Sequence, residues 1–240
     1  MKKLLLTLAI LFFPHSAFAL IASSSVAVDD GGGGATMTLL NVSATSSKNI
    51  VIAFVEVNGD VSGTCTSASV NGVAMTKLNA GFNVTGAGWM TVWYVIGMGG
   101  TQNLTMVGCT VNQVNKSMVA YSGVSQTSPI DNSINNLVSS GTSIATSLTT
   151  NSNNAVMVSF MVDGVGTGVT ADVGTFKKLV NYGGFIGIGD SGGAITPATL
   201  YSMKWLGTLA SLGVIQLSIV PDVPLSAPSI LFGNYYGNWY

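Results

Sequence analysis

The stretch NIVIAFVEV, residues 49–57, has mainly apolar side chains on both faces of an extended chain, and AVMVSFMV, residues 155–162, does too. A strand that is apolar on both faces is typical of the centre of a sheet covered on two sides. VIQLSIV, residues 214–220, instead alternates between aliphatic and polar side chains. That period of two indicates a strand with one face in the core. Together these stretches predict a fold of layered β-sheets.

Short runs of the same kind follow one another along the chain, separated by turn residues and without a long helical period. Asn71-Gly72 lies between two such runs and predicts a two-residue hairpin turn. No internal repeat is evident. We therefore predict one all-β domain over residues 36–220, a two-sheet antiparallel β-sandwich of the jelly-roll or concanavalin-like kind. The expected strands are Thr36–Val42, Asn49–Val57, Thr66–Val70, Val73–Leu78, Trp89–Ile96, Gln102–Val107, Asn115–Tyr121, Ser143–Thr149, Ala155–Val162, Thr199–Trp205 and Val214–Val220.

Residues 1–19 have the pattern of a bacterial export signal. Lys2-Lys3 gives a positive start, Leu4–Phe13 is an apolar run, and Ala17-Phe18-Ala19 fits the small-x-small cleavage pattern. The apolar run is shorter than the roughly 20 residues that a membrane-spanning helix needs, which favours a cleaved signal over an uncleaved anchor. The sequence predicts cleavage after Ala19, no membrane span in the mature chain, and a secreted or cell-surface location.

Residues that carry proton-transfer or anion-binding chemistry are scarce. The chain has no arginine, its one histidine is His15 inside the export signal, and its one glutamate is Glu56. Histidine is the usual general base and metal ligand, and arginine the usual anion clamp. Charged residues make up only 7% of the chain and form no basic cluster. We therefore expect no catalytic residue, no cofactor, no metal and no nucleic-acid partner, and little electrostatic resistance to self-association.

The chain contains two cysteines, Cys65 and Cys109. An even count in an exported protein favours a disulfide bond between them, and the alternative is a pair of free buried thiols. Neither cysteine has a histidine partner in the mature chain, so a catalytic thiol is not expected.

The two ends of the mature chain differ from its body. Residues 20–35 contain the tetraglycine Gly31–Gly34, which predicts a hinge, and Leu20–Asp30 could add as a strand to the sheet edge of a neighbouring molecule. Residues 221–240 combine prolines with a strongly aromatic end, which predicts a tail that contacts a partner or the body of the protein. The candidate contact residues are Tyr235, Tyr236, Trp239, Tyr240 and, as a ring on which a glycan could stack, Trp89.

Several local patterns imitate functional motifs. Gly189–Gly193 spells GDSGG, as around the nucleophile of chymotrypsin-like proteases, and together with Gly187 it matches a GxGxxG dinucleotide pattern. Because the mature chain has no histidine and no helix is expected to follow, we interpret both patterns as a glycine-rich hairpin tip. The aspartates interpreted as solvated turn residues, rather than as Ca²⁺ ligands or a glycosidase pair (Asp172 with Asp190), are Asp29, Asp30, Asp163, Asp172 and Asp190.

The stretches NGVAMTKLN (71–79), WMTVWYVIG (89–97) and AYSGVSQTSPID (120–131) occur in this order. The set resembles a family of jelly-roll-like β-sandwich domains found in secreted bacterial proteins and in phage tail or fibre proteins, with its Y-S-G-V-x-Q-x-x-P-I block. The chain departs from that pattern at Asn71, where glycine is usual, and at Ser125, where aspartate is usual. The family has no settled activity, so the resemblance implies the fold and an extracellular setting.

The Y-S-G-V-x-Q-x-x-P-I block is expected to form a structural corner rather than a binding loop. Gly123 allows the backbone to turn as a strand leaves its sheet, Pro129 is expected to block further strand pairing, and Ile130 to tuck under the sheet edge.

Three functions remain open at this stage. The first is a secreted, non-enzymatic structural or adhesive module that self-associates, by strand addition, into a surface filament or layer, or that contacts a cell-surface partner. The second is a carbohydrate-binding, lectin-like module. The third is a glycosidase.

Overall fold

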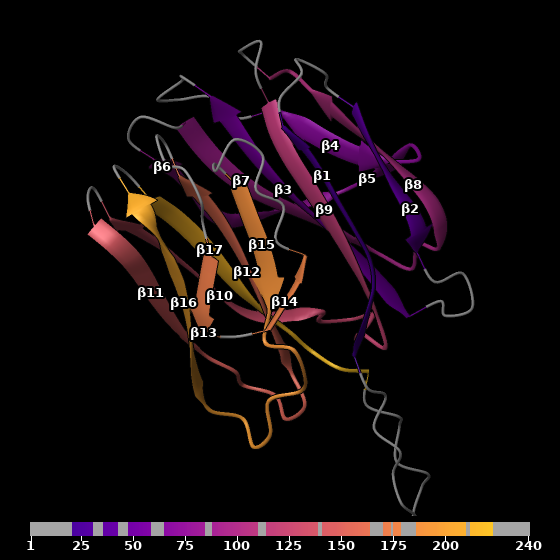
Figure 1. Ribbon diagram of the computed structural model, residues 1–240. Coiled ribbons are helices and arrows are strands. Elements are labelled where there is room, and N and C mark those ends of the chain that lie inside the picture. Colours follow the sequence, from indigo (N-terminus) through magenta and orange to yellow (C-terminus); the bar gives the residue numbers. More distant parts are fainter. Residues whose placement is uncertain are drawn as a thin grey trace, which may run out of the picture.

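The computed structural model describes residues 21–30, 36–42, 48–58, 65–84, 88–109, 114–138, 141–163, 170–173, 175–178, 186–209 and 212–222. These residues form β-strands joined by turns (Figure 1). Among them there is no helix of the length and apolarity that crossing a membrane requires. The all-β class predicted from the sequence is therefore confirmed.

The strands fall into two groups along the chain. The first group is β1 (Ala22–Asp30), β2 (Thr36–Val42), β3 (Asn49–Asn58), β4 (Ser67–Val70), β5 (Val73–Ala74), β6 (Thr76–Val84), β7 (Gly88–Ile96), β8 (Gly100–Val107) and β9 (Val114–Ser122). The second group is β10 (Ile130–Val138), β11 (Gly141–Thr149), β12 (Val156–Asp163), β13 (Thr170–Val173), β14 (Thr175–Lys178), β15 (Ile186–Asp190), β16 (Leu200–Leu209) and β17 (Leu212–Ile219).

Each group builds two antiparallel sheets. The first inner sheet has the order β1-β9-β3-β7-β6 and the first outer sheet β2-β8-β4-β5. The second inner sheet has the order β10-β17-β12-β15-β14 and the second outer sheet β11-β16-β13. The described strands thus make four sheets where the sequence predicts two. The jelly-roll connectivity implied by the resemblance stays a prediction.

The second half of the chain repeats the strand order of the first. The described strands of the two halves correspond one to one, with only β5 left without a counterpart. The inner order β1-β9-β3-β7-β6 corresponds to β10-β17-β12-β15-β14, and the outer order β2-β8-β4 corresponds to β11-β16-β13. The expectation of no internal repeat was wrong. The sequence similarity that survives is short: NIVIAF at 49–54 corresponds to AVMVSF at 155–160. The two halves therefore share their strand connectivity and an apolar central strand.

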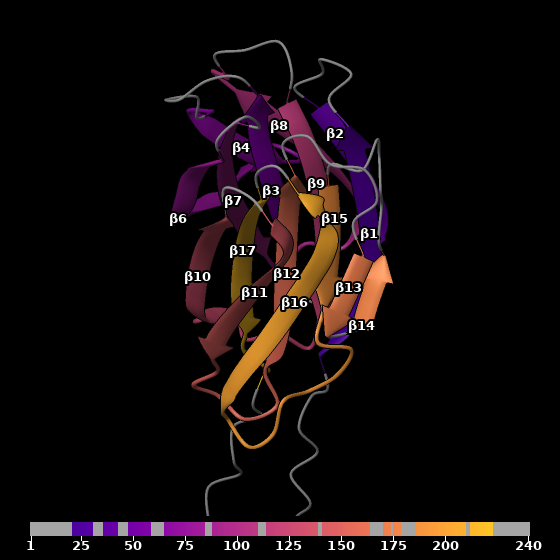
Figure 2. The same cartoon turned by 60° about the vertical axis from the view of Figure 1, so that its left-hand side comes forward.

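The four sheets stack in the order outer, inner, inner, outer (Figures 1 and 2). The largest core cluster lies between the two inner sheets, and further clusters lie between each inner sheet and its outer sheet. At the centre of the stack the rings of Phe54 on β3 and Phe160 on β12 are stacked, with centroids 4.7 Å apart. These two residues hold equivalent positions in the repeat, so the halves meet about an approximate two-fold relation. This explains why the stretches 49–57 and 155–162 are apolar on both faces.

Four strands of the second half are missing from the sequence-based prediction: β10, β13, β14 and β15. β10 begins at Ile130, directly after Pro129, which was expected to block pairing.

The strand β15 contains Gly187 and Gly189 and is buried throughout, so the hairpin-tip interpretation is wrong for these residues. The reason is packing: a Cβ atom on Gly187 would lie 2.5 Å from the ring of Trp205, and only glycine lets the indole approach the strand that closely.

The Y-S-G-V block forms the junction between the two halves. Gly123 has φ +74°, as expected for a sharp turn after β9. Its carbonyl accepts the backbone N–H of Asp222, and Val124 forms a β-bridge with Pro221, just past β17. Lys48, just before β3, accepts the N–H of Val124 with its carbonyl and forms an ion pair with Asp222 through its side chain. The corner expected from the sequence therefore ties both halves together.

The Asn71-Gly72 hairpin is confirmed. Both residues have positive φ, +49° and +80°, and β4 pairs with β5 on either side of them. The side chain of Asn71 also accepts the backbone N–H of Asn103 and donates to the carbonyl of Thr101 on β8. Asparagine at this position therefore supplies both the turn conformation and side-chain hydrogen bonds to the neighbouring strand.

Candidate contact surfaces

The disulfide bond expected from the sequence is present. Cys65 and Cys109 are joined with an S–S distance of 2.06 Å. Cys65 lies just before β4 and Cys109 just after β8, two strands that pair in the first outer sheet. The bond therefore closes one end of that sheet.

Of the other predicted contact residues, Trp89 lies within the described part of the chain. Tyr235, Tyr236, Trp239 and Tyr240, and the tetraglycine Gly31–Gly34, lie outside the described residues. Trp89 is half-buried on β7, opposite Val57 of β3. It lies on the face of β7 that is turned toward the first outer sheet, together with Trp93. The carbohydrate-binding role of Trp89 stays a prediction.

The N-terminal segment expected to reach a neighbour pairs within its own chain. Ala22–Asp30 forms β1, antiparallel to β9 at the edge of the first inner sheet. Ile21, just before it, is buried in the core between the inner sheets. Addition of this strand to another molecule would require it to leave β9.

The aspartates whose side chains the structure describes do not gather into a catalytic or metal-binding group. Asp190 is buried between the inner sheets, where its carboxylate accepts hydrogen bonds from the Tyr121 hydroxyl at 3.0 Å and from the Gly192 N–H at 2.8 Å. Asp172 lies on the second outer sheet, paired with Lys204 at 2.7 Å. The two aspartates considered as a glycosidase pair are thus in different layers. No three His, Cys, Asp or Glu side chains converge on a metal position within the described part of the chain.

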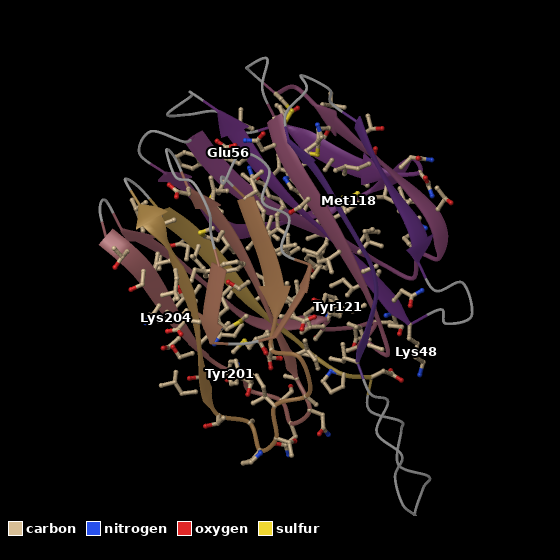
Figure 3. All side chains as sticks on the ribbon, in the orientation of Figure 1. Lys48, Glu56, Met118, Tyr121, Tyr201 and Lys204 are labelled. Carbon is tan, nitrogen blue, oxygen red and sulfur yellow. A yellow bond between two sulfur atoms is a disulfide. The ribbon has the colours of Figure 1, made fainter. Side chains whose placement is uncertain are left out.

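Buried polar groups also correct the interpretation of the turn aspartates. Asp163 is the last residue of β12 and is 1% exposed, as is Asp190. The contact between Tyr121, which is labelled in Figure 3, and Asp190 links β9 of one inner sheet to β15 of the other. Burial and the adjacent Asp190 charge raise the pKa of Tyr121 well above its ordinary value. Tyr121 therefore stays a neutral hydrogen-bond donor across the interface between the halves.

Glu56 is the titratable group that sequence reasoning noted without assigning it a place. It lies near the end of β3, is 1% exposed, and accepts a hydrogen bond from the side-chain amide of Asn115 on β9 (Figure 3). Burial raises its pKa from 4.5 to about 7, and the Asn115 hydrogen bond offsets part of that rise. A single glutamate in a strand that is apolar on both faces could have signalled this, because every side chain of such a strand is covered.

This raised pKa predicts a specific dependence of stability on pH. The folded protein holds the Glu56 proton more tightly than the unfolded chain does, so the stabilisation is complete below pH 4.5 and is lost as pH rises to about 7. The free energy of unfolding should fall over this window by on the order of 3 kcal/mol. Glu56→Gln should remove that dependence and be more stable than wild type at pH 8. Urea unfolding at a series of pH values measures both effects.

The matched control is Asp172→Asn, which makes the same carboxylate-to-amide change at a half-exposed position. It should leave the wild-type pH dependence between 4.5 and 7 in place. A Glu56→Gln protein whose stability still falls by the wild-type amount over that window would contradict the assignment.

The outward face of the first outer sheet is free of charge among its described side chains. Ser69 on β4 lies beside Thr105 on β8, and Ser67 lies beside Val107, which is 52% exposed. The outward-facing residues described there are Ser67, Ser69, Ala74, Thr101, Asn103, Thr105 and Val107. We call this set outer face 1.

The outward face of the second outer sheet has the same character. Ser147 on β11 lies opposite Ser202 on β16, and Thr149 opposite Leu200, which is 63% exposed. Its only described charges are Lys204 and Asp172, which neutralise each other. The outward-facing residues described there are Ser143, Ala145, Ser147, Thr149, Asp172, Leu200, Ser202, Lys204 and Leu206. We call this set outer face 2.

The edges of two neighbouring sheets are protected by a pair of asparagines on β10. The Asn132 amide donates to the Thr149 carbonyl of β11 at 2.9 Å, and its oxygen accepts the N–H of Ser133 at 3.0 Å. Asn136, four residues on, repeats the arrangement with the Ala145 carbonyl and the N–H of Leu137. Both β10 and β11 are edge strands. The two asparagines therefore form hydrogen bonds with backbone groups to which the backbone of an added strand would otherwise bond.

The remaining edge strands carry other features that oppose strand addition. The strand β5 has two residues, and β2 has an irregular register with its neighbour. The strands β1, β6, β13 and β14 have irregular registers with their neighbours. Two of them also carry a described charged side chain, Lys77 on β6 and Asp172 on β13. The described edges are therefore poor sites for a further strand, which leaves the two outer faces as the candidate contact surfaces.

Comparisons of the chain with protein-family models, with curated proteins and with solved structures gave no match. The resemblance to the jelly-roll-like family therefore rests on the quoted residues alone.

Proposed function

We propose that this chain is an exported, non-enzymatic structural or adhesive module that associates with copies of itself or with a cell-surface partner. The observation that carries the proposal is the pair of outer faces, which are rich in serine and threonine and close to free of net charge among their described residues. Surfaces of this kind offer little electrostatic resistance to close contact with a neutral surface. The predicted export signal and the disulfide bond are compatible with an extracellular setting.

A structural role also agrees with where the polar chemistry is placed. Asp190 and Tyr121 hold the two halves together, and Glu56 is enclosed beside Asn115. Asp172 is engaged with Lys204 on the surface. These groups stabilise layers of the stack and do not converge around a shared open space, which supports a role based on shape and surface.

The test is the native state of the exported protein. We expect the mature chain, purified from the secreting cell, to form assemblies whose mass by light scattering exceeds that of a monomer, or to be retained on the cell surface. Electron microscopy of the same material would identify filaments or layers. A protein that stays monomeric at all concentrations and is not retained on cells would refute the proposal, and binding of that monomer to a glycan array would support the lectin-like alternative.

A further inference from the structure

If copies of this chain associate, as the proposed function states, the structure also indicates which of their surfaces come into contact. Two routes are available to a β-protein: strands can pair edge to edge, or sheets can stack face to face. Edge pairing is disfavoured by the Asn132 and Asn136 bridges between β10 and β11, and by the charges and irregular registers of the other described edges. The strand β1 is already engaged with β9. Face stacking is the route that the described surface leaves open.

The molecule itself is a stack of sheets packed face to face. Outer face 1 and outer face 2 end that stack on opposite sides, because each outer sheet covers the far side of its inner sheet. Each outer face presents short polar side chains and one well-exposed aliphatic residue, Val107 or Leu200. Two such faces would not repel each other electrostatically, because outer face 1 has no described charge and outer face 2 contains the neutralised pair of Lys204 and Asp172.

We propose that a second copy of this chain stacks on the outer faces, so that the four-sheet stack continues from molecule to molecule. Because the two faces point in opposite directions, a copy that binds through one face keeps the other available. Contacts of this type do not close into a dimer and instead generate an open linear assembly. The internal repeat thereby gives a single chain two equivalent contact faces.

The test places one positive charge on each face. Thr105→Lys alters outer face 1, and Ser147→Lys alters outer face 2; both positions are exposed. A lysine without a partner between stacked sheets is costly, so the double variant should require at least about tenfold more protein to begin assembling. Each single variant should stop at a dimer or below, because at most one competent face remains. Light scattering over a concentration series gives the mass in each case.

The matched control is Ser128→Lys, the same kind of change at an exposed position in the junction between the halves. It should assemble as wild type does, and all variants should melt within a few degrees of it by circular dichroism. If wild type and the double variant assemble to the same extent, face stacking is wrong while the proposed function stands. If wild type neither assembles nor adheres, the proposed function fails first.

Discussion

Replacing Phe160 with alanine is expected to lower the free energy of unfolding by about 3–5 kcal/mol, and Phe54→Ala by a similar amount. Both rings are fully buried, and they stack on each other at the centre of the core between the inner sheets. Each substitution leaves a ring-sized cavity where the two halves meet. Urea unfolding followed by circular dichroism measures the loss.

The two substitutions should also be coupled. A stacked aromatic pair contributes about 0.5–1.5 kcal/mol beyond the burial of its area, so the double variant should be destabilised by less than the sum of the single variants. Phe54→Ala combined with Leu148→Ala is the control, because Leu148 lies in a different core cluster, in the second half. That pair should be additive within about 0.5 kcal/mol.

Unfolding of wild type should be a single transition. The inner sheets bury apolar side chains from both halves in one cluster, and either half alone would expose that surface to water. Two separated transitions, or additive losses for Phe54→Ala and Phe160→Ala, would show that the halves are independent and that the ring stack does not join them.

The parts of the fold that could be predicted from sequence are those in which the residues of a single strand or turn show a recognisable order of apolar, polar or turn-forming side chains. The stretch 49–57 is apolar on both faces because it has an inner sheet on one side and an outer sheet on the other. The opposite faces taken by Trp93 and Tyr94 follow from the period of two. Asn71-Gly72 has a conformation that few other residue pairs adopt. Local rules suffice in these cases.

The missed elements depend on partners that are distant in sequence. The strand β10 reads IDNSINNLV, a composition typical of turns, yet Asn132 and Asn136 are there because they bridge to β11. The strand β15 reads IGIGD, and its glycine at 187 is required by the indole of Trp205. No local pattern gives either contact. The repeat was missed for the same reason, since equal connectivity leaves no periodic signal when the side chains differ.

The candidate surface was predictable only in its general character. Low charge and abundant serine and threonine indicate a weakly charged surface. Which of those residues share a face depends on the register between strands, such as Ser69 beside Thr105. The aromatic tail that sequence reasoning favoured lies outside the described residues, so its part in any contact stays a prediction.

Removal of the disulfide bond should cost about as much as loss of an aromatic ring. Cys65 and Cys109 are 44 residues apart. Closing a loop of that length lowers the conformational entropy of the unfolded chain, which raises its free energy by about 4 kcal/mol at 25 °C. The closed segment contains β4 to β8, which belong to both sheets of the first half. The bond therefore limits the unfolded chain where strands from two layers must find their partners. We expect Cys65→Ser with Cys109→Ser to shift the urea midpoint downward accordingly.

The control is the response to a reducing agent. Dithiothreitol should lower the midpoint of wild type toward that of the double variant and should leave the double variant unchanged, because no other cysteine exists in the chain. The same bond reports on compartment, since a thiol-alkylating reagent should leave the exported protein unlabelled and label both cysteines when export is blocked and the protein stays in a reducing compartment. Equal midpoints for wild type and the double variant would mean that the bond does not constrain the unfolded chain. Labelling of the exported protein would mean that the pair is not oxidised where the protein acts, and the cysteines would then not support an extracellular setting.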